Sequence, residues 1–412
     1  MGVVTTKFIY QQNYLFEFLL TAIMIGCIAK PKLLTALAVG ILLVRPNERM
    51  DLMVPFTRVA MICLVLMMII NKNRIRKPLW YTSDKYLFIF IAIIFAKTLA
   101  YNPADMVGNF MYIFTGLLLY FAVIWFMCNE SGIKLFYCSV AVSCFLICLE
   151  PVYYHYAVPN GSDLWNMFHI EQSQRLQAWG MWANPNETAL IACLGTANIL
   201  FITSRCGRSI HYITTVILVS FFSFVIFLTA SRAGLASFLL IFFPSIIFIK
   251  RKSIKFVTIL LILCTIIISQ SLTPERKDAE GSTEARGELR ARGIQIIKDF
   301  PITGVGFRRL RYELGSKPVH NTYLQAFAET GVIGGLFFLI YLFVVGKNLY
   351  ALSKKGSPDG INSYLYFMSG LYCSTVFYYL WGNQLLSVIF FIIIAQIVSS
   401  VMLLEEKKSA SV

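Results

Sequence analysis

Long apolar runs fill most of the chain, and short polar or basic segments separate them. A helix needs about 20 apolar residues to cross the ~30 Å hydrocarbon core of a bilayer, and most of the runs approach this length. Strands of a membrane barrel would instead alternate apolar and polar residues. The chain is therefore predicted to be an all-α polytopic integral membrane protein. The pattern places its spans near residues 14–28, 33–44, 53–70, 86–99, 106–127, 133–153, 187–203, 211–229, 234–249, 254–271, 322–345, 363–382 and 386–404.

The first two runs leave the number of spans open. Residues 33–44 are short for a crossing, and counting both runs puts the N-terminus outside. If the two runs form one bent or re-entrant element, the N-terminus lies inside and the total is twelve. The prediction is therefore about 12–13 transmembrane helices.

Basic residues orient these spans. Four strongly basic loops fall on one side when the spans between them are counted, and the positive-inside rule makes that side cytoplasmic. These loops lie at 72–77, 205–208, 250–252 and 354–355. The loops at 154–186 and 272–320 then face the other side, which is the periplasm in a Gram-negative cell. The protein is thus expected in the inner membrane with its large loop in the periplasm.

The same assignment divides the chain into six parts. They are N-terminal helices (1–153), a periplasmic loop (154–186), helices with the Ser231-Arg232 turn (187–271), a large periplasmic loop (272–320), C-terminal helices (321–404) and a cytoplasmic tail (405–412).

Composition narrows the possible partners. The chain is 58% hydrophobic and 14% charged, with a net charge of +15. Because basic residues collect in cytoplasmic loops of membrane proteins, this charge predicts a bilayer and no nucleic acid. None of the ten cysteines falls in a long outer loop, so no disulfide framework is expected. No spacing typical of a metal site occurs, and neither a metal nor another cofactor is expected.

The 272–320 loop holds most of the polar chemistry, with ten basic and seven acidic residues. Residues 284–299 fit an amphipathic helix with Leu289, Ile296 and Phe300 on one face, which we expect to lie along the membrane surface. Arginine suits a diphosphate because its planar fork makes two parallel charged hydrogen bonds. The candidates in this helix are Arg286, Arg290 and Arg292.

His320 stands where this loop enters the next span, followed by Asn321 and, further along the same helix, by Glu329. A histidine near its ordinary pKa of ~6.5 can take a proton from a sugar hydroxyl. The alternative is a histidine that only caps the helix. Asn321 and Glu329 are candidate substrate-binding residues.

Two further arginines lie beside predicted spans. Arg232 sits in a turn with almost no loop, where an arginine is costly unless it is paired or hydrated. It is a candidate for function, and a side chain that snorkels to the membrane edge is the alternative. Arg175 is the only Lys or Arg in the 154–186 loop, whose aromatic residues otherwise resemble an interfacial belt. Asn184-Pro-Asn186 is expected to cap the following helix.

These residues carry a family resemblance over roughly 170–400. Five segments resemble motifs of the O-antigen ligase and Wzy-type polymerase superfamily: Arg175 with Asn184-Pro-Asn186, Thr229-Ala-Ser-Arg-Ala-Gly234, Arg286 ahead of Pro301-Ile-Thr-Gly-Val-Gly306, His320-Asn-Thr-Tyr-Leu-Gln325, and Glu329-Thr-Gly331. Many members have an aromatic residue shortly after the loop arginine, but this chain has Arg290 near that position. The true counterpart among Arg286, Arg290 and Arg292 therefore stays open.

The resemblance implies metal-independent glycosyl transfer at the periplasmic face, from an undecaprenyl-diphosphate-linked glycan to a sugar hydroxyl, with inversion. Fixed arginines can stabilise the leaving diphosphate, which agrees with our interpretation of the residues. His320, Arg232 and Arg286 are the expected catalytic residues. Arg175, Arg290, Arg292, Asn321 and Glu329 are expected to bind substrate. A chain-length regulator or a flippase is the partner protein implied.

The acceptor separates two alternatives. A Wzy-type polymerase, which the 184–186 motif and the run from His320 to Gly334 slightly favour, uses another lipid-linked glycan. An O-antigen ligase of the WaaL type uses the lipid A-core. A membrane solute transporter is a third alternative from another class, to which the intramembrane charges Glu17, Arg58, Lys97 and Glu150 would belong.

Overall fold

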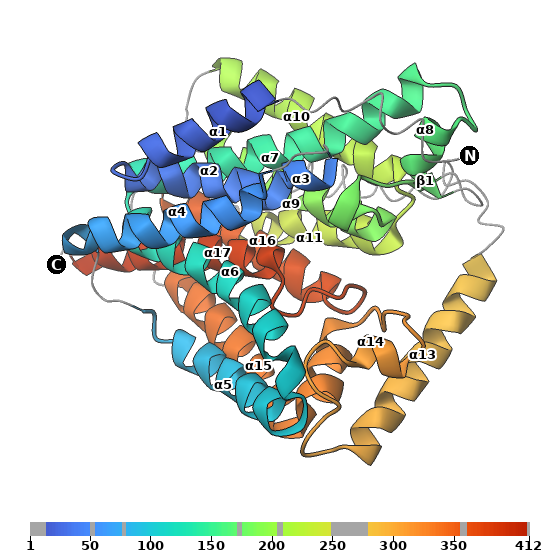
Figure 1. The fold of residues 1–412 in the computed structure, drawn as a ribbon. Coiled ribbons are helices and arrows are strands. Elements are labelled where there is room, and N and C mark those ends of the chain that lie inside the picture. Colours follow the sequence, from blue (N-terminus) through green and yellow to red (C-terminus); the bar gives the residue numbers. More distant parts are fainter. Residues whose placement is uncertain are drawn as a thin grey trace. The chain divides into compact units, whose positions relative to one another are not determined.

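The computed structural model describes residues 14–49, 54–75, 80–170, 175–203, 209–248, 279–354 and 361–409. Within these residues the chain is almost entirely helical (Figure 1), which confirms the predicted all-α polytopic fold. Helices occupy the predicted spans there, whereas the span at 254–271 lies outside the described residues. Among the described helices, five are long and apolar enough to cross a membrane: those at Pro103–Phe126, Glu130–Ala157, Pro185–Thr203, Thr322–Leu352 and Val388–Lys407.

The chain forms two compact units. The first comprises the described residues of 1–79 and 117–229, and the second those of 80–116 and 230–412. One helix, α6 (Met106–Phe126), belongs to both. The other elements of the first unit are α1 (Tyr14–Gly26), α2 (Pro31–Val44), α3 (Pro46–Arg49), α4 (Phe56–Ile70), η2 (Lys72–Arg74), α7 (Glu130–Ala157), α8 (Asp163–Met167), β1 (His169–Ile170), β2 (Arg175–Leu176), η4 (Gly180–Trp182), α9 (Pro185–Thr203) and α10 (Ser209–Leu228).

The second unit carries the polar loop of the sequence prediction. Its elements are α5 (Asp84–Tyr101), η3 (Pro103–Asp105), α11 (Arg232–Phe248), α13 (Ala279–Asp299), α14 (Leu310–Glu313), α15 (Thr322–Lys354), α16 (Ile361–Tyr378) and α17 (Val388–Ser409). Helix α11 packs along α16, and α15 packs against α5, α13 and α16. Figure 1 shows α13 beside α14 and the loop that leads into α15.

Helices α1 and α2 are two separate helices of 13 and 14 residues, joined by residues 27–30. Pro31 begins α2, where its missing N–H leaves no hydrogen bond unmade. At ~1.5 Å per residue each helix is shorter than a full crossing. The choice between twelve and thirteen spans therefore remains as the sequence left it.

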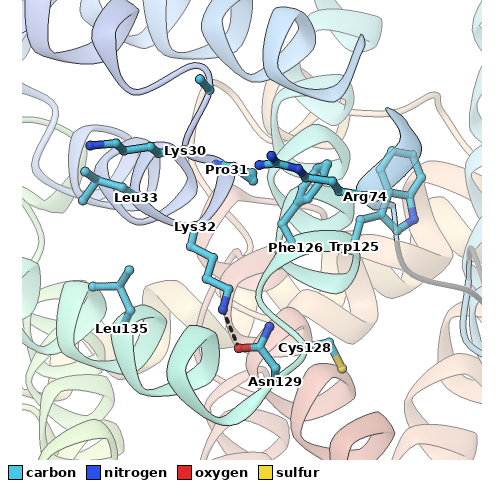
Figure 2. A pocket seen from close by; sticks show the side chains of 11 residues that line it. Lys30, Pro31, Lys32, Leu33, Arg74, Trp125, Phe126, Cys128, Asn129 and Leu135 are labelled. Carbon is cyan, nitrogen blue, oxygen red and sulfur yellow. Dashed lines mark hydrogen bonds between the residues drawn. The ribbon is translucent and has the colours of Figure 1, made fainter. Parts of the chain in front are cut away.

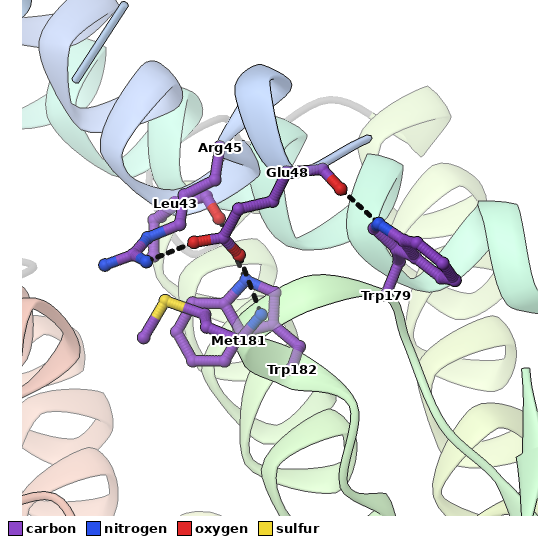
Figure 3. Close-up of polar contacts among 6 residues, drawn as sticks. All are labelled: Leu43, Arg45, Glu48, Trp179, Met181 and Trp182. Carbon is purple, nitrogen blue, oxygen red and sulfur yellow. Dashed lines mark hydrogen bonds and ion pairs between the residues drawn. The ribbon is translucent and has the colours of Figure 1, made fainter. Parts of the chain in front are cut away.

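A carboxylate fixes the loop before α9 in the first unit (Figure 3). Glu48 Oε2 accepts from the backbone N–H of Met181 at 2.8 Å, and its backbone oxygen accepts from Trp179 Nε1. Trp182 Nε1 donates to the backbone oxygen of Leu43 at 2.9 Å. Gly180 has φ +65°, and a Cβ there would lie 2.4 Å from Glu48 Oε2. Another residue at this position would strain the backbone and displace the Glu48 carboxylate.

Helix α15 is broken at Gly331, where the backbone turns to φ 71° and ψ 177°. The 301–306 loop packs into this break: Gly306 N donates to Glu329 O at 3.0 Å, and Val332 N donates to Pro301 O at 2.8 Å. Lys97 Nζ donates to the backbone oxygens of Ile302, Thr303 and Thr330. The ammonium thus joins a carbonyl group beside the break, that of Thr330, to two carbonyl groups of the 301–306 loop, which is a structural role for this intramembrane charge.

The contact between Gly304 and Glu329 yields a stability prediction. Gly304 has φ +59°, and a Cβ there would lie 2.5 Å from the Glu329 carbonyl carbon. Because backbone atoms cannot move aside as a flexible side chain can, Gly304→Ala should destabilise the protein by at least ~1–3 kcal/mol. Thermal unfolding in detergent and the yield of monodisperse protein measure the effect.

Gly287→Ala is the matched control. Gly287 lies on the exposed side of α13, and a Cβ there meets nothing within 4 Å. This change should be neutral or stabilising by up to ~1 kcal/mol. Equal melting temperatures for Gly304→Ala and Gly287→Ala would contradict the proposed close packing.

Candidate active site

One face of α13 packs on the protein. Leu289 and Ile296 lie against a buried cluster formed by Leu310, Leu314, Val319 and Ala328. The predicted amphipathic helix is present, and Leu289 and Ile296 on its apolar face are covered by protein. Phe300 takes no part in this contact, because its side chain is 48% exposed just after the end of the helix at Asp299. The expected position of the helix along the membrane surface stays a prediction.

The packing of α13 separates its three candidate arginines. Arg286 and Arg290 are four residues apart, so they lie on the same side of the helix, and both are half-buried. Arg292 is exposed, because two residues along a helix turn the side chain to the opposite side. The structure thus brings Arg286 and Arg290 together and leaves Arg292 apart from them.

Arg290 contacts the turn between α16 and α17. Its Nη2 atom donates to the backbone oxygen of Leu380 at 3.2 Å, and its guanidinium carbon lies 4.8 Å from the centre of the Trp381 ring. This stacking holds the plane of the guanidinium group. Arg290 Nε and Trp381 Nε1 are buried donors for which the described residues supply no acceptor. Two hydrogen-bond donors are therefore left for another group.

The same turn holds His320. The backbone N–H of His320 donates to Asn383 Oδ1 at 3.0 Å, and Asn383 Nδ2 lies 3.5 Å from His320 Nδ1. Thr322 strengthens the attachment, because its N–H donates to Tyr379 O at 2.7 Å and its hydroxyl donates to Gly382 O at 2.8 Å. His320 itself has φ 51°, in the left-handed region. Such strain persists only where the surroundings hold the residue, and it is frequent at functional sites.

These neighbours make the site electrically positive. Burial is the largest cause that lowers the pKa of His320, and together with the charges of Arg286 and Arg290 it brings the pKa to about 4. Burial and the charge of Arg290 also lower the pKa of Arg286. The sequence prediction assumed an ordinary histidine pKa, so this is a correction. At neutral pH the imidazole of the free protein is uncharged and lies near two cationic side chains, an arrangement that suits an anionic ligand.

Asn321 has a structural task. Its Oδ1 atom accepts from the backbone N–H of Leu324 at 2.8 Å, so Asn321 and not His320 is the N-cap of α15. The capping alternative for His320 is therefore wrong.

This cap gives a second prediction. Asn321→Ala should cost about 1 kcal/mol of stability, because the Leu324 N–H loses its acceptor, whereas Asn321→Ser should restore the cap. Thermal unfolding and transfer activity of both variants are the measurements. If Asn321→Ser is as stable as the parent and yet inactive, Asn321 also contacts substrate, as the sequence suggested.

Glu329 is 1% exposed, and its Oε1 atom accepts from Gln325 Nε2 at 3.1 Å. Its backbone oxygen receives the Gly306 N–H described above. The contacts of Glu329 therefore lie at the helix break and involve the 301–306 loop. In the part of the chain that the structure describes, Glu329 makes no hydrogen bond or ion pair with His320, although both residues were expected near the substrate.

Arg232 and Arg175 lie apart from this cluster in the contacts they make. Arg232 is the first residue of α11 and is exposed, while Ser231 Oγ caps the helix by accepting from Gly234 N at 3.0 Å. Arg175, in the first unit, donates from Nε to Thr229 O at 2.9 Å and from Nη2 to Asn186 Oδ1 at 3.4 Å. Asn184 Oδ1 accepts from Asn186 N at 2.9 Å, which confirms the predicted cap of α9.

The sequence prediction missed the α16–α17 turn. The span expected to reach residue 382 ends at Tyr378, and residues 379–383 form the turn that holds His320 and Arg290. The signal was present as the short polar break Gly382-Asn-Gln384 between two apolar runs. Among the described residues, no group of three His, Cys, Asp or Glu side chains could hold a metal ion.

A family model matches one segment of the chain. Residues 189–339 match the model of the O-antigen ligase family. The resemblance predicted from the sequence is thereby confirmed for this segment. No curated protein matches the chain significantly.

The segment that matches the O-antigen ligase family runs from α9 into α15. It includes Arg232, Arg286, His320 and Glu329, whereas Arg175 and the α16–α17 turn lie outside it. Together with the apolar helices, the match indicates a multi-pass bacterial membrane protein of surface polysaccharide biosynthesis. An enzymatic role in O-antigen ligation or polymerisation follows from the family.

Proposed function

We propose that this protein is a glycosyltransferase that moves a glycan from undecaprenyl diphosphate to a sugar hydroxyl at the periplasmic face of the inner membrane. The observation that carries the proposal is the cluster of His320, Arg286 and Arg290, in which an uncharged imidazole lies near two half-buried guanidinium groups. Within the described residues, neither arginine forms an ion pair with a carboxylate. A diphosphate is an anion that such a pair can bind through charge-assisted hydrogen bonds.

Each residue of the cluster has one role in the proposed reaction. The acceptor hydroxyl attacks the anomeric carbon, its proton passes to His320, and the bond from that carbon to the diphosphate oxygen breaks. The leaving diphosphate takes the electron pair, and the arginines stabilise its growing charge without reorganisation. Because Asn383 Nδ2 faces Nδ1 with an N–H, the ring lone pair lies on Nδ1. At 3.5 Å that contact is long enough for the acceptor hydroxyl to displace it.

Arg232 is proposed as a third cation for the diphosphate. It begins α11, and α11 packs along α16, whose far end leads into the turn that contacts Arg290. On the predicted topology the start of α11 and the end of α16 face the periplasm together. If the three arginines take the place of a metal ion, transfer is metal-independent, as the resemblance implies. Attack opposite the leaving diphosphate inverts the anomeric centre.

The acceptor is proposed to be a second lipid-linked glycan, which makes the protein a Wzy-type polymerase. Joining the glycan to lipid A-core is the second candidate, and the match to the O-antigen ligase family favours it. The gel pattern of surface polysaccharide from a deletion strain separates them. Single repeats attached to core mean a polymerase, and a core without repeats means a ligase. Unchanged polysaccharide would contradict both.

The low pKa of His320 predicts the acid side of the pH profile. The neutral imidazole is the base, so activity falls as pH drops through its pKa, and kcat/KM reports the free enzyme. With a pKa of about 4, kcat/KM should stay level from pH 8 to about pH 5. An ordinary pKa of ~6.5 would instead cost about tenfold by pH 5.5.

Donor binding should shift the acid side of the pH profile. A diphosphate neutralises the two arginines, so the pKa of His320 rises in the complex and kcat falls at a higher pH than kcat/KM does. Purified protein in liposomes, returned to pH 7 after each exposure to show that it survived, provides the measurement. A midpoint near pH 6.5 in kcat/KM would contradict the assigned surroundings of His320.

A further inference from the structure

A cavity of about 550 Å³ lies in the first unit (Figure 2), and none of the residues assigned to transfer lines it. Three turns surround it: the turn from α1 to α2, the η2 turn that follows α4, and the turn from α6 to α7. Three of its lining residues are cationic and none is acidic. The lining residues are Ala29, Lys30, Pro31, Lys32, Leu33, Arg74, Trp125, Phe126, Cys128, Asn129 and Leu135.

The positive charge of this cavity is not neutralised by its own lining. Lys32 Nζ donates to Asn129 Oδ1 at 2.8 Å and to Ser131 Oγ at 2.9 Å, and both acceptors are uncharged. These bonds fix the ammonium group in place, because Asn129 is itself held as the N-cap of α7. Among the described residues, Lys30 and Arg74 form no ion pair with a carboxylate. Figure 2 shows Arg74 beside Trp125 and Phe126.

Exposed apolar side chains adjoin these cations along the chain. Ile23 and Ile25 on α1 are 50% and 56% exposed, and Ile69 and Ile70 at the end of α4 are 62% and 63% exposed. On membrane helices such side chains face lipid. Cations and an apolar surface therefore lie next to each other, so a lipid could place its charged headgroup at the cations and its acyl chains against the apolar surface.

We propose that this cavity binds the phosphate headgroup of an anionic phospholipid of the cytoplasmic leaflet, with the acyl chains against α1 and α4. Arg74 of the basic segment 72–77 lines the cavity, and the positive-inside rule places this end in the cytoplasm. Basic cavities between helices at that membrane face suit anionic headgroups. The site uses none of the residues proposed for glycosyl transfer, so it can be tested independently of the proposed function.

Native mass spectrometry of the purified full-length protein can count the phosphatidylglycerol molecules that it retains from mixed micelles. The parent should retain phosphatidylglycerol and lose phosphatidylcholine. Each cation near an anionic headgroup contributes about fivefold in affinity, so Lys30→Gln with Arg74→Gln should weaken phosphatidylglycerol binding about 30-fold. Lys72→Gln is the matched control, because Lys72 is exposed on η2 and does not line the cavity.

Two further experiments serve as controls. The exchange Lys30→Arg with Arg74→Lys keeps both charges and should keep phosphatidylglycerol bound, which shows that loss in the glutamine variant is not misfolding. Glycerol 3-phosphate carries the headgroup charge without acyl chains and should not displace the lipid at equal concentration. Displacement by it would make the cavity a site for soluble phosphates, and undiminished lipid binding by the double glutamine variant would refute the site.

Discussion

Replacing His320 with asparagine should reduce glycan transfer by about 10²–10⁴-fold while leaving the binding of the lipid-linked donor nearly unchanged. The variant loses the nitrogen proposed to accept the proton of the acceptor hydroxyl, and it leaves both arginines in place. Asparagine is the sharpest replacement because it tolerates the left-handed backbone that His320 adopts, with φ 51°. Its backbone N–H can still donate to Asn383. Transfer by purified protein in liposomes is the measurement.

His320→Gln and His320→Ala complete the series. Glutamine keeps some hydrogen bonding but cannot serve as a base near neutral pH, so it should fail as badly as alanine does. The melting temperature of each variant shows whether the site has folded. Transfer at the parental rate by either the asparagine or the glutamine variant would remove His320 from the chemistry and leave it as a structural residue of the α15 entrance.

Replacing Arg286 with lysine should slow transfer nearly as much as replacing it with alanine, by about 10²–10³-fold. Lysine keeps the positive charge but loses the planar fork that makes two parallel hydrogen bonds to a diphosphate. Arg290→Lys should behave alike, because it also loses the stacking on Trp381. Arg232→Lys is expected to fail too, if Arg232 is the third cation.

Arg292→Lys is the matched control for this series. Arg292 belongs to the same helix and carries the same charge, but it is exposed on the opposite side from Arg286 and Arg290. It should retain transfer close to the parental rate. The bidentate proposal is refuted if Arg232→Lys and Arg286→Lys are fully active at normal protein levels, and a severe loss in Arg292→Lys would mean that the choice between the arginines is wrong.

The amino-acid sequence by itself determined the helices and the polar loop. An apolar run of bilayer length folds as a helix in lipid, because only a helix satisfies the hydrogen bonds of its backbone groups within the segment. Within the described residues, helices therefore lie close to the predicted apolar runs, and α13 lies close to its predicted bounds. His320 and the arginine series stood out because charged and titratable residues are rare in such a chain.

Only the tertiary structure decided which of these residues meet. Helix periodicity puts Arg286 and Arg290 on one side of α13, but the packing of Leu289 and Ile296 is what turns that side toward His320. The α16–α17 turn comes from a part of the chain about 60 residues beyond His320, so no local pattern could assign Asn383 as its partner. The same holds for Lys97, which appeared as an isolated charge and proves to bind three backbone oxygens across the break in α15.

The pKa of His320 shows the same division. The residue type predicts an ordinary value of ~6.5, whereas burial and two arginine charges lower the pKa to about 4. Desolvation and Coulomb interactions depend on distances between segments that are far apart in the chain. The sequence therefore determines which groups can act, and the packing of α13 and the α16–α17 turn around His320 determines the charge state in which they do so.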